Sequence, residues 1–314
     1  MSSACSSAQA VGGFRSADTM PLVSVVMAAW RPRADWLLTA VRSVLDEHGC
    51  ELELVLVDDG NAQPVEELVV AIDDVRLRVV RIVHTGQSAA RNAGIGAARG
   101  THFRFVDCDD VVPSGSTTHL LALCGGGDDL IGYGATQFCD EDLTPRALRA
   151  CDLHGPAASA CLLDRFPVYV PAMLFPKRVV GAAGPWEESM DVMADWEWVL
   201  RALEHTDVRG DDRCVYLYRQ HGESIQGRTS NERAEHAHHR IVNAYFMRHP
   251  EATGGAFERR VRAGVHLKYA RTYLRDRRPA RSVDRLIRGT RLDPPAGARV
   301  ALALAARQLR PSRG

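Results

Sequence analysis

Strand-like and helix-like segments alternate through the first third of the chain, and this alternation limits the folds that are open to it. Buried-strand patterns occupy residues 22–28, 52–57, 77–83 and 102–106. Helical patterns lie between them at residues 35–45, 64–72 and 88–98. Strands that alternate with helices at this spacing form βαβ units. We therefore expect an α/β fold with a Rossmann-like, mostly parallel sheet flanked by helices.

Acidic residues follow two of the predicted strands. Asp58 and Asp59 come after the second strand, and the run Asp107-Cys108-Asp109-Asp110 follows the fourth. Ligands of parallel sheets bind at the carboxyl ends of the strands. Carboxylates this close repel one another unless a positive charge lies among them, and Mg²⁺ or Mn²⁺ prefers oxygen ligands. The pattern favours a divalent-cation site, and the alternative is an acidic surface turn or a helix cap.

The rest of the chain is less regular. Further strands are expected at 129–140 and 166–175, a glycine- and proline-containing loop at 181–191, a helix at 194–204 and a short strand at 214–218. The chain after residue 230 is expected to be helical and arginine-rich. Residues 1–20 are rich in serine, alanine and glycine without the apolar core of a signal peptide, so we expect a disordered tail.

Composition narrows the class of protein. The chain has 314 residues, enough for one large domain with an appendage, and equal numbers of basic and acidic residues (39 each), so bulk charge does not indicate nucleic acid. Its eight cysteines are scattered without a C-x-x-C pair, which argues against a zinc site or disulfides and favours the reducing cytoplasm. The sequence has no apolar run that is long enough to span a membrane.

Five short segments, in order along residues 21–225, resemble the family 2 glycosyltransferases of the GT-A fold. They are the first strand (23–27), Val57-Asp58-Asp59-Gly60, the run 86–94, the acidic run 105–110, and the stretch 181–197 with its continuation at 217–221. The resemblance implies a nucleotide-sugar-binding half at 21–115 and an acceptor-binding half at 116–228. The helical region at 229–314 would be an extension.

The resemblance also implies roles for individual residues. Asp107 to Asp110 correspond to the family's D-x-D element. The implied contacts to the nucleotide sugar are Ala28, Trp30, Asp58, Asp59, Arg91 and Asp107. The implied ligands of Mg²⁺ or Mn²⁺ are Asp109 and Asp110, with His221 as a weaker candidate. Trp186 and Glu187 would line the acceptor site.

Asp195 is expected to be the general base, with Asp191 as the alternative. The family usually has an acidic residue directly before this base, but the chain has Ala194 there, which puts the acceptor class in doubt. The Q-x-x-R-W element of processive polysaccharide synthases is missing after Asp195. A non-processive enzyme is therefore expected.

The resemblance implies an inverting glycosyltransferase that uses a UDP- or dTDP-sugar and a hydroxyl-bearing acceptor, which could be a small molecule, a glycan or a lipid-linked molecule. Two alternatives stay open: a sugar-nucleotide nucleotidyltransferase and a catalytically degenerate protein that binds nucleotide sugars. The first usually has a glycine-rich loop after the first strand, where residues 28–33 have no glycine. The arginine-rich C-terminal helices are expected to have solvated faces, and the alternatives are peripheral contact with the inner face of a membrane or a homo-oligomer.

Overall fold

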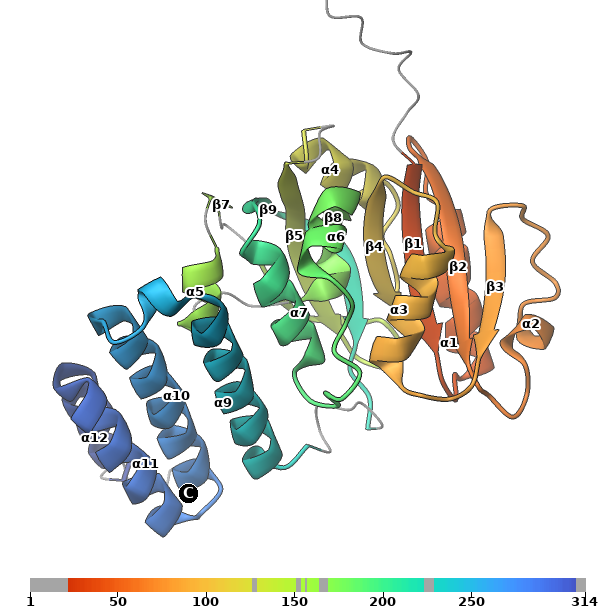
Figure 1. The fold of residues 1–314 in the computed structure, drawn as a ribbon. Helices are drawn as coiled ribbons and strands as arrows, with labels where there is room; N and C mark the ends of the chain where they lie inside the picture. Colours follow the sequence, from red (N-terminus) through yellow and green to blue (C-terminus); the bar gives the residue numbers. More distant parts are fainter. Residues whose placement is uncertain are drawn as a thin grey trace, which may run out of the picture.

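The computed structural model describes residues 22–125, 129–150, 154–155, 157–163, 169–222 and 229–308. Its main body is a sheet flanked by helices, and a group of helices lies at one end of this sheet, at the left in Figure 1. The expected tail at 1–20 lies outside the described residues. The α/β class and the helical C-terminal region are confirmed.

The first part of the chain forms the predicted βαβ series. Its elements are β1 (Leu22–Ala29), α1 (Ala34–Leu45), β2 (Glu51–Asp59), α2 (Val65–Leu68), β3 (Leu77–Ile82), α3 (Gln87–Ala97), β4 (His102–Asp107) and α4 (Ser116–Leu123).

The middle and the end of the chain complete the sheet and add the helical region. The middle elements are β5 (Leu130–Cys139), β6 (Pro145–Arg149), β7 (His154–Gly155), α5 (Ala158–Leu162), η1 (Val170–Ala172), β8 (Met173–Pro176), α6 (Lys177–Ala183), α7 (Ala194–Leu203) and β9 (Asp207–Arg219). The helical region consists of α9 (Asn231–Arg248), η2 (Pro250–Ala252), α10 (Ala256–Arg275), α11 (Pro279–Leu292) and α12 (Pro294–Gln308).

The strands follow the order β3-β2-β1-β4-β8-β5-β9-β7, and β6 pairs with β5 outside this path. The long pairings, among β1 to β4 and between β5 and β9, are parallel. The short strand β8 is antiparallel to both β4 and β5 and joins the two parallel groups into one sheet. The predicted mostly parallel sheet is therefore confirmed, with an antiparallel insertion at its centre.

Four local predictions need correction. The short strand expected at 214–218 is part of the much longer β9, and the helix expected at 64–72 is limited to α2. The loop expected at 181–191 begins inside α6. The strand expected at 166–175 is β8, which follows η1, and residues 166–168 lie outside the described part.

Helix α3 packs closely on the sheet, and this packing positions the residues at its N-terminal end. Gly94 faces β1 so closely that a Cβ atom there would lie 2.3 Å from Cγ1 of Val26. Only glycine allows an approach of this kind without a shift of the strand. The contact holds α3 against β1 and β2, with Gln87 and Arg91 directed toward the end of β4.

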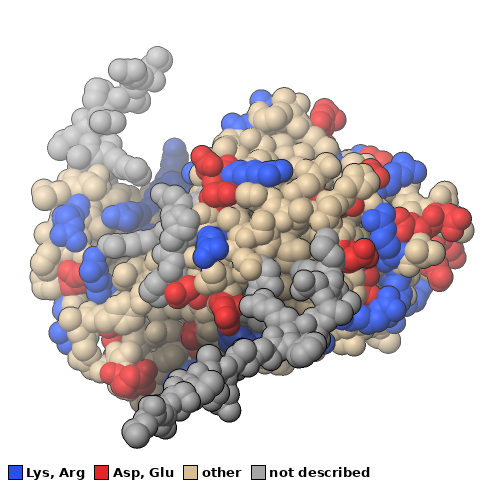
Figure 2. Space-filling view, turned by 90° about the horizontal axis from the view of Figure 1, so that it is seen from above, with Lys and Arg blue, Asp and Glu red and all other residues tan. Residues whose placement is uncertain are grey.

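The C-terminal helices pack on one another and present many charges to solvent. Their arginines form ion pairs with acidic residues, as Arg285 does with Glu235 and Arg281 with Glu232. Figure 2 shows basic and acidic side chains interspersed among uncharged ones on the face seen from above. Among the helices that the structure describes, none is both long and apolar enough to cross a membrane.

Candidate active site

The carboxyl ends of three strands bring the predicted nucleotide-site residues to one edge of the sheet. In the register of β1 with its neighbours, Ala28 lies beside Asp107 and Ala29 lies beside Asp58. Trp30 follows directly after β1. The expectation that the two acidic segments share one edge is thus confirmed.

Asp58 shapes the turn after β2 rather than facing open solvent. It is 1% exposed, and it accepts hydrogen bonds from the backbone N–H and side-chain amide of Asn61 (2.9 and 2.7 Å) and from the backbone of Val65 (3.0 Å). Burial opposes its ionisation, but these hydrogen bonds together hold the pKa of Asp58 below its ordinary value. Asn61 also donates to the carbonyl of Ala29 (2.9 Å), so Asp58 connects the ends of β1 and β2.

Asp59 holds the loop between β3 and α3. Its carboxylate contacts Nδ1 of His84 (2.8 Å) and accepts from the backbone N–H groups of Thr85 (2.9 Å) and Gly86 (3.1 Å). Trp30 stacks on the same His84, with the ring centroids 4.6 Å apart and the planes within 8° of parallel. Trp30 is 47% exposed, and the guanidinium of Arg31 also lies over its ring, with 4.5 Å between Cζ and the ring centroid.

Asp107 lies where both halves of the α/β domain meet. It accepts hydrogen bonds from Gln87 (3.0 Å) and from Arg91 (3.2 Å). Burial raises the pKa of the Asp107 carboxyl; Arg91 opposes this shift, while Asp109 and Asp195 add to it. Asp195 is therefore within electrostatic range of the Asp107 carboxyl.

Asp109 and Asp110 have different surroundings. Oδ2 of Asp109 lies 2.9 Å from Nε2 of His221, and the Asp109 side chain is 33% exposed. Asp110 is 1% exposed and accepts from the hydroxyl of Tyr216 (2.5 Å) and the backbone N–H of Arg219 (2.6 Å). Burial, together with the nearby Asp109 and Asp107, raises the pKa of Asp110 well above its ordinary value. Asp109 is therefore the more available of the two.

Tyr216 and Arg219 are residues that the sequence alone did not single out. Arg219 is 4% exposed, and its Nε donates to the backbone carbonyl of Asp109 (2.7 Å). Its guanidinium also lies over the ring of Trp36, with 4.7 Å between Cζ and the ring centroid. These contacts attach the acidic run to β9; Arg219 lies within the segment 217–221 of the resemblance, and Tyr216 just precedes that segment.

The predicted acceptor residue Trp186 is a core residue, which corrects the expectation that it lines the acceptor site. Its side chain is 1% exposed and stacks on Trp198 with ring centroids 4.6 Å apart. The guanidinium of Arg91 covers its ring at 4.4 Å. The neighbouring Glu187 is exposed, as expected for a residue at the mouth of a site.

Asn92 of α3 holds the loop that contains Trp186. Its side-chain amide accepts from the backbone N–H of Trp186 (2.8 Å) and donates to the carbonyl of the same residue (3.0 Å). It also donates to the carboxylate of Glu188 (2.9 Å). Asn92 thus connects the nucleotide half to the acceptor half, a role that the sequence did not indicate although Asn92 lies within the segment 86–94.

Asp195 lies in the first turn of α7, two residues after a strained residue. Met193, the residue before the helix, has a left-handed backbone (φ 60°), which is costly for a side chain other than glycine. Asp195 is partly buried and accepts from the backbone N–H of Trp196 (2.8 Å). The alternative base Asp191 is exposed and forms an ion pair with Arg233 of α9. The two carboxylates thus differ: Asp195 is partly buried, and Asp191 is exposed and paired with Arg233.

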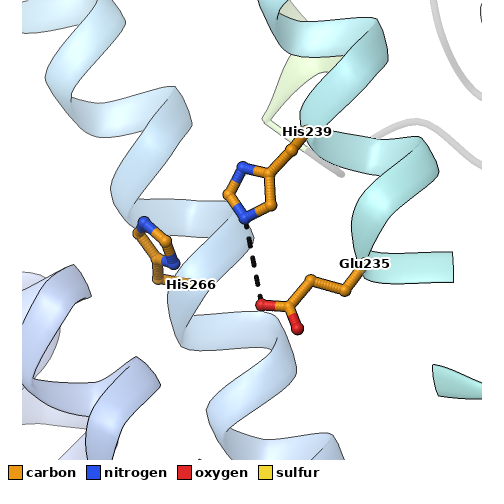
Figure 3. Close-up of side chains that lie close together, drawn as sticks. All are labelled: Glu235, His239 and His266. Carbon is orange, nitrogen blue, oxygen red and sulfur yellow. Dashed lines mark ion pairs between the residues drawn. The ribbon is translucent and has the colours of Figure 1, made fainter. Parts of the chain in front are cut away.

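A second cluster with metal-binding residue types lies in the helical region, between α9 and α10. Glu235, His239 and His266 bring ligand atoms within 4.8 Å of one another, and Nε2 of His239 is 3.9 Å from the Glu235 carboxylate (Figure 3). However, this carboxylate already binds Arg285 through both oxygens and accepts from Tyr273 (2.7 Å). A guanidinium in this position repels a cation, so we assign the cluster to helix packing.

An α/β sheet with acidic residues at its carboxyl edge and a helical extension defines the GT-A type of fold. Among solved structures, S. aureus TarS 1-349 matches with a TM-score of 0.61 at 14% identity, covering 90% of this chain and 83% of that chain. The structure of S. aureus TarS 1-349 in complex with UDP-GlcNAc gives a TM-score of 0.60 at 13% identity, covering 86% and 91%. These likenesses support the shared fold.

Comparisons of sequence identify the family. Residues 24–167 match the model of glycosyl transferase family 2. The succinoglycan biosynthesis protein ExoO of Rhizobium meliloti (strain 1021) is 43% identical over 96 residues, which are 30% of this chain and 27% of that protein. The uncharacterized glycosyltransferase EpsJ of Bacillus subtilis (strain 168) is 29% identical over 218 residues, covering 66% and 63%. The chain thus spans less than two thirds of either relative, and residues 24–167 of its α/β part match the family 2 glycosyltransferases.

Proposed function

We propose that the chain is an inverting glycosyltransferase that transfers a sugar from a nucleoside diphosphate sugar to an acceptor hydroxyl. The observation that carries the proposal is the meeting of two halves at one edge. Asp107 and Asp109 come from the nucleotide half, and Asp195, from the other half, is close enough to raise the pKa of Asp107. A carboxylate base beside a donor site is the arrangement that single displacement needs.

The donor is proposed to be a UDP- or dTDP-sugar. The partly exposed ring of Trp30 would offer a stacking surface for a pyrimidine base, next to the turn held by Asp58 and Asp59, once the guanidinium of Arg31 moves from over the ring. Arg91, held by Asp107 at 3.2 Å, supplies a positive charge on the side of the phosphates. The UDP-GlcNAc complex of TarS supports a donor of this class.

The residues at the end of β4 fit a divalent cation, Mg²⁺ or Mn²⁺. The available donors are the carboxylate of Asp109 and the imidazole of His221, 2.9 Å apart, with Asp107 two residues before Asp109. Asp110, the second expected ligand, is engaged with Tyr216 and Arg219, so we propose that it orients the run instead. A cation here would stabilise the negative charge on the departing diphosphate.

Asp195 is proposed to accept the proton of the acceptor hydroxyl. The acceptor oxygen then forms a bond to the anomeric carbon while the bond from that carbon to the diphosphate oxygen breaks. Attack from the face opposite the leaving group inverts the configuration, so an α-linked donor gives a β-linked product. The first turn of α7 orients the carboxylate, since Trp198 on the same helix is fully buried.

Isothermal titration calorimetry with UDP, dTDP and GDP, each with and without Mn²⁺, tests the donor site. We expect UDP or dTDP to bind more tightly than GDP, and more tightly in the presence of Mn²⁺. The variant Trp30→Ala should weaken binding of the favoured nucleotide. Failure of all three to bind, or equal binding that does not depend on metal, would contradict the proposal.

A further inference from the structure

The helical region encloses a pocket away from the sheet edge. It has a volume of about 410 Å³ and lies between the end of α5 and the helices α9, α10 and α12. This volume is within the range of sites that hold small organic ligands. Its lining contains none of the residues assigned above to the donor site, the metal site or the base.

The walls of the pocket are largely apolar. They are formed by Leu162, Leu163, Val265, Leu267, Ala296 and Val300. Gly264 of α10 also lines the pocket, and a Cβ atom added there would have no neighbour within 4 Å. An apolar wall with open space beside it suits a hydrocarbon chain.

The polar part of the lining is positively charged. Lys268, Arg271 and Arg299 contribute to it, and none of the described lining residues is acidic. Arg271 and Arg299 are exposed, and no carboxylate among the described residues pairs with them, whereas several other arginines of this region are paired. Two unneutralised guanidinium groups beside an apolar wall suit an anion that carries an apolar tail.

A buried side chain in the lining lacks a hydrogen-bond partner. His238 of α9 is 1% exposed, and neither of its ring nitrogens has a partner among the described residues. Burial, followed by the charges of Lys268 and His239, lowers the pKa of His238 to about 3, so the ring is neutral at pH 7. A neutral imidazole keeps one N–H donor and one acceptor, and an unsatisfied buried donor is costly. A bound polar group would supply its missing partner.

We propose that this pocket binds an anionic amphiphile, with a phosphate head held by Arg271 and Arg299 and a hydrocarbon tail along the walls of α10 and α12. The occupant follows from charge complementarity at the head and apolar complementarity at the tail. The proposal goes beyond glycosyl transfer and does not depend on it, because the site is separate from Asp107, Asp109 and Asp195.

Calorimetric titration of the full chain with dodecyl phosphate, below its aggregation concentration and without sugar donor, tests the proposal. Inorganic phosphate and dodecyl maltoside serve as the comparison ligands. We expect saturable binding of one dodecyl phosphate, with much weaker binding of both comparison ligands. Absence of dodecyl phosphate binding overturns the proposal. Equal affinity for inorganic phosphate would show a simple anion site. Equal affinity for dodecyl maltoside would show an uncharged apolar groove. Either result also overturns the proposal.

The variant Gly264→Trp fills the pocket from a position where the backbone has room for a side chain. We expect it to weaken dodecyl phosphate binding about tenfold or more, since the added side chain would occupy the space that the ligand needs. The matched control Gly264→Ala raises helix propensity without filling the pocket and should bind as the natural chain does. Unchanged binding by Gly264→Trp contradicts the location.

The charge requirement has a control of its own. The double variant Arg271→Glu/Arg299→Glu should also lose about tenfold or more in affinity, because like charges then face the phosphate. The double variant Arg259→Glu/Arg291→Glu changes the net charge equally at exposed positions outside the lining. If both double variants weaken binding to the same extent, the effect is one of net charge and the proposed head-group contacts are wrong. The melting temperature of each variant shows whether it is folded.

Discussion

At the scale of single residues, substitutions of Asp195 and of Asp191 should have different effects on kcat. Asp195→Asn should lower kcat by about 10²- to 10⁴-fold, because an amide cannot accept the proton, while UDP binding changes little. Asp191→Asn removes an exposed ion pair with Arg233 and should keep kcat close to that of the natural chain. Release of nucleoside diphosphate, followed by chromatography, measures both. The reverse pattern would assign the base to Asp191.

Asp109, His221 and Asp110 are distinguished by what each contacts. His221→Ala and Asp109→Asn should reduce the part of UDP binding that depends on Mn²⁺, because each removes one of the two available metal donors. Asp110→Ala should instead destabilise the protein by about 1–3 kcal/mol, since it leaves the hydroxyl of Tyr216 and the N–H of Arg219 unpaired. Calorimetry and urea unfolding separate these effects. If His221→Ala keeps the full Mn²⁺ dependence, His221 is not a ligand.

At the scale of elements, the contact between α3 and the loop after α6 depends on one amide. Asn92→Ala removes its hydrogen bonds to Trp186 and Glu188 and should loosen residues 184–193 by about 1–3 kcal/mol. We expect faster hydrogen exchange in this loop and a higher KM for the acceptor, with UDP affinity retained. Unchanged exchange would show that other contacts hold the loop.

A buried ion pair joins β4, α4 and the segment that follows α1. Arg104 is fully buried, lies 3.7 Å from Glu47 and donates to Ser116 (2.9 Å) and Thr117 (2.7 Å); burial lowers its pKa to about 10. Arg104→Met should cost about 3–5 kcal/mol, because it leaves the Glu47 carboxylate buried without its partner. Arg33→Ala, which breaks an exposed pair with Asp35, should cost less than about 1 kcal/mol. Urea unfolding midpoints measure both, and equal losses would contradict the assignment.

At the scale of the whole molecule, the packing of the helical region should depend on pH. Burial opposes ionisation of Glu235, but the nearby His239 and the hydrogen bonds from Arg285 and Tyr273 together lower its pKa from 4.5 to about 2. The unfolded chain therefore binds this proton more readily, so the stabilisation is complete above about pH 4.5 and is lost as pH falls toward 2. Glu235→Gln should be less stable than the natural chain at pH 7, and the gap should narrow below pH 4.5. Circular dichroism during urea unfolding at several pH values measures the gap, and a constant gap would contradict this account.

Much of the fold and part of the site could be predicted from local patterns. The spacing of apolar residues predicted β1 to β4 and α3. The acidic residues after two strands indicated the carboxyl edge of the sheet, because parallel strands end on the same side. Asp59, Asp107 and Asp109 were singled out on short-range signals of this kind, and Asp195 by the resemblance to the family.

Other features depend on contacts between distant segments and have no local signal. Trp186, which was expected to line the acceptor site, is a core residue, because Trp198 and Arg91 cover its ring. The hydrogen bonds of Asp110 to β9 come from more than a hundred residues further along the chain. The full length of β9 likewise follows from its pairing with β5. Residues 207–213 are rich in charged side chains and by themselves do not indicate a strand.

One helix, α3, touches both substrate regions: Arg91 holds Asp107 on one side and Asn92 holds the acceptor loop on the other. If donor binding stabilises the position of Asp107 and α3, it also stabilises the loop that Asn92 holds, so the two binding events are coupled in free energy. Thermodynamic reciprocity requires the acceptor to raise donor affinity by the same factor as the donor raises acceptor affinity. Two adjacent side chains would thereby make the two substrates cooperative, without any movement of one domain against another.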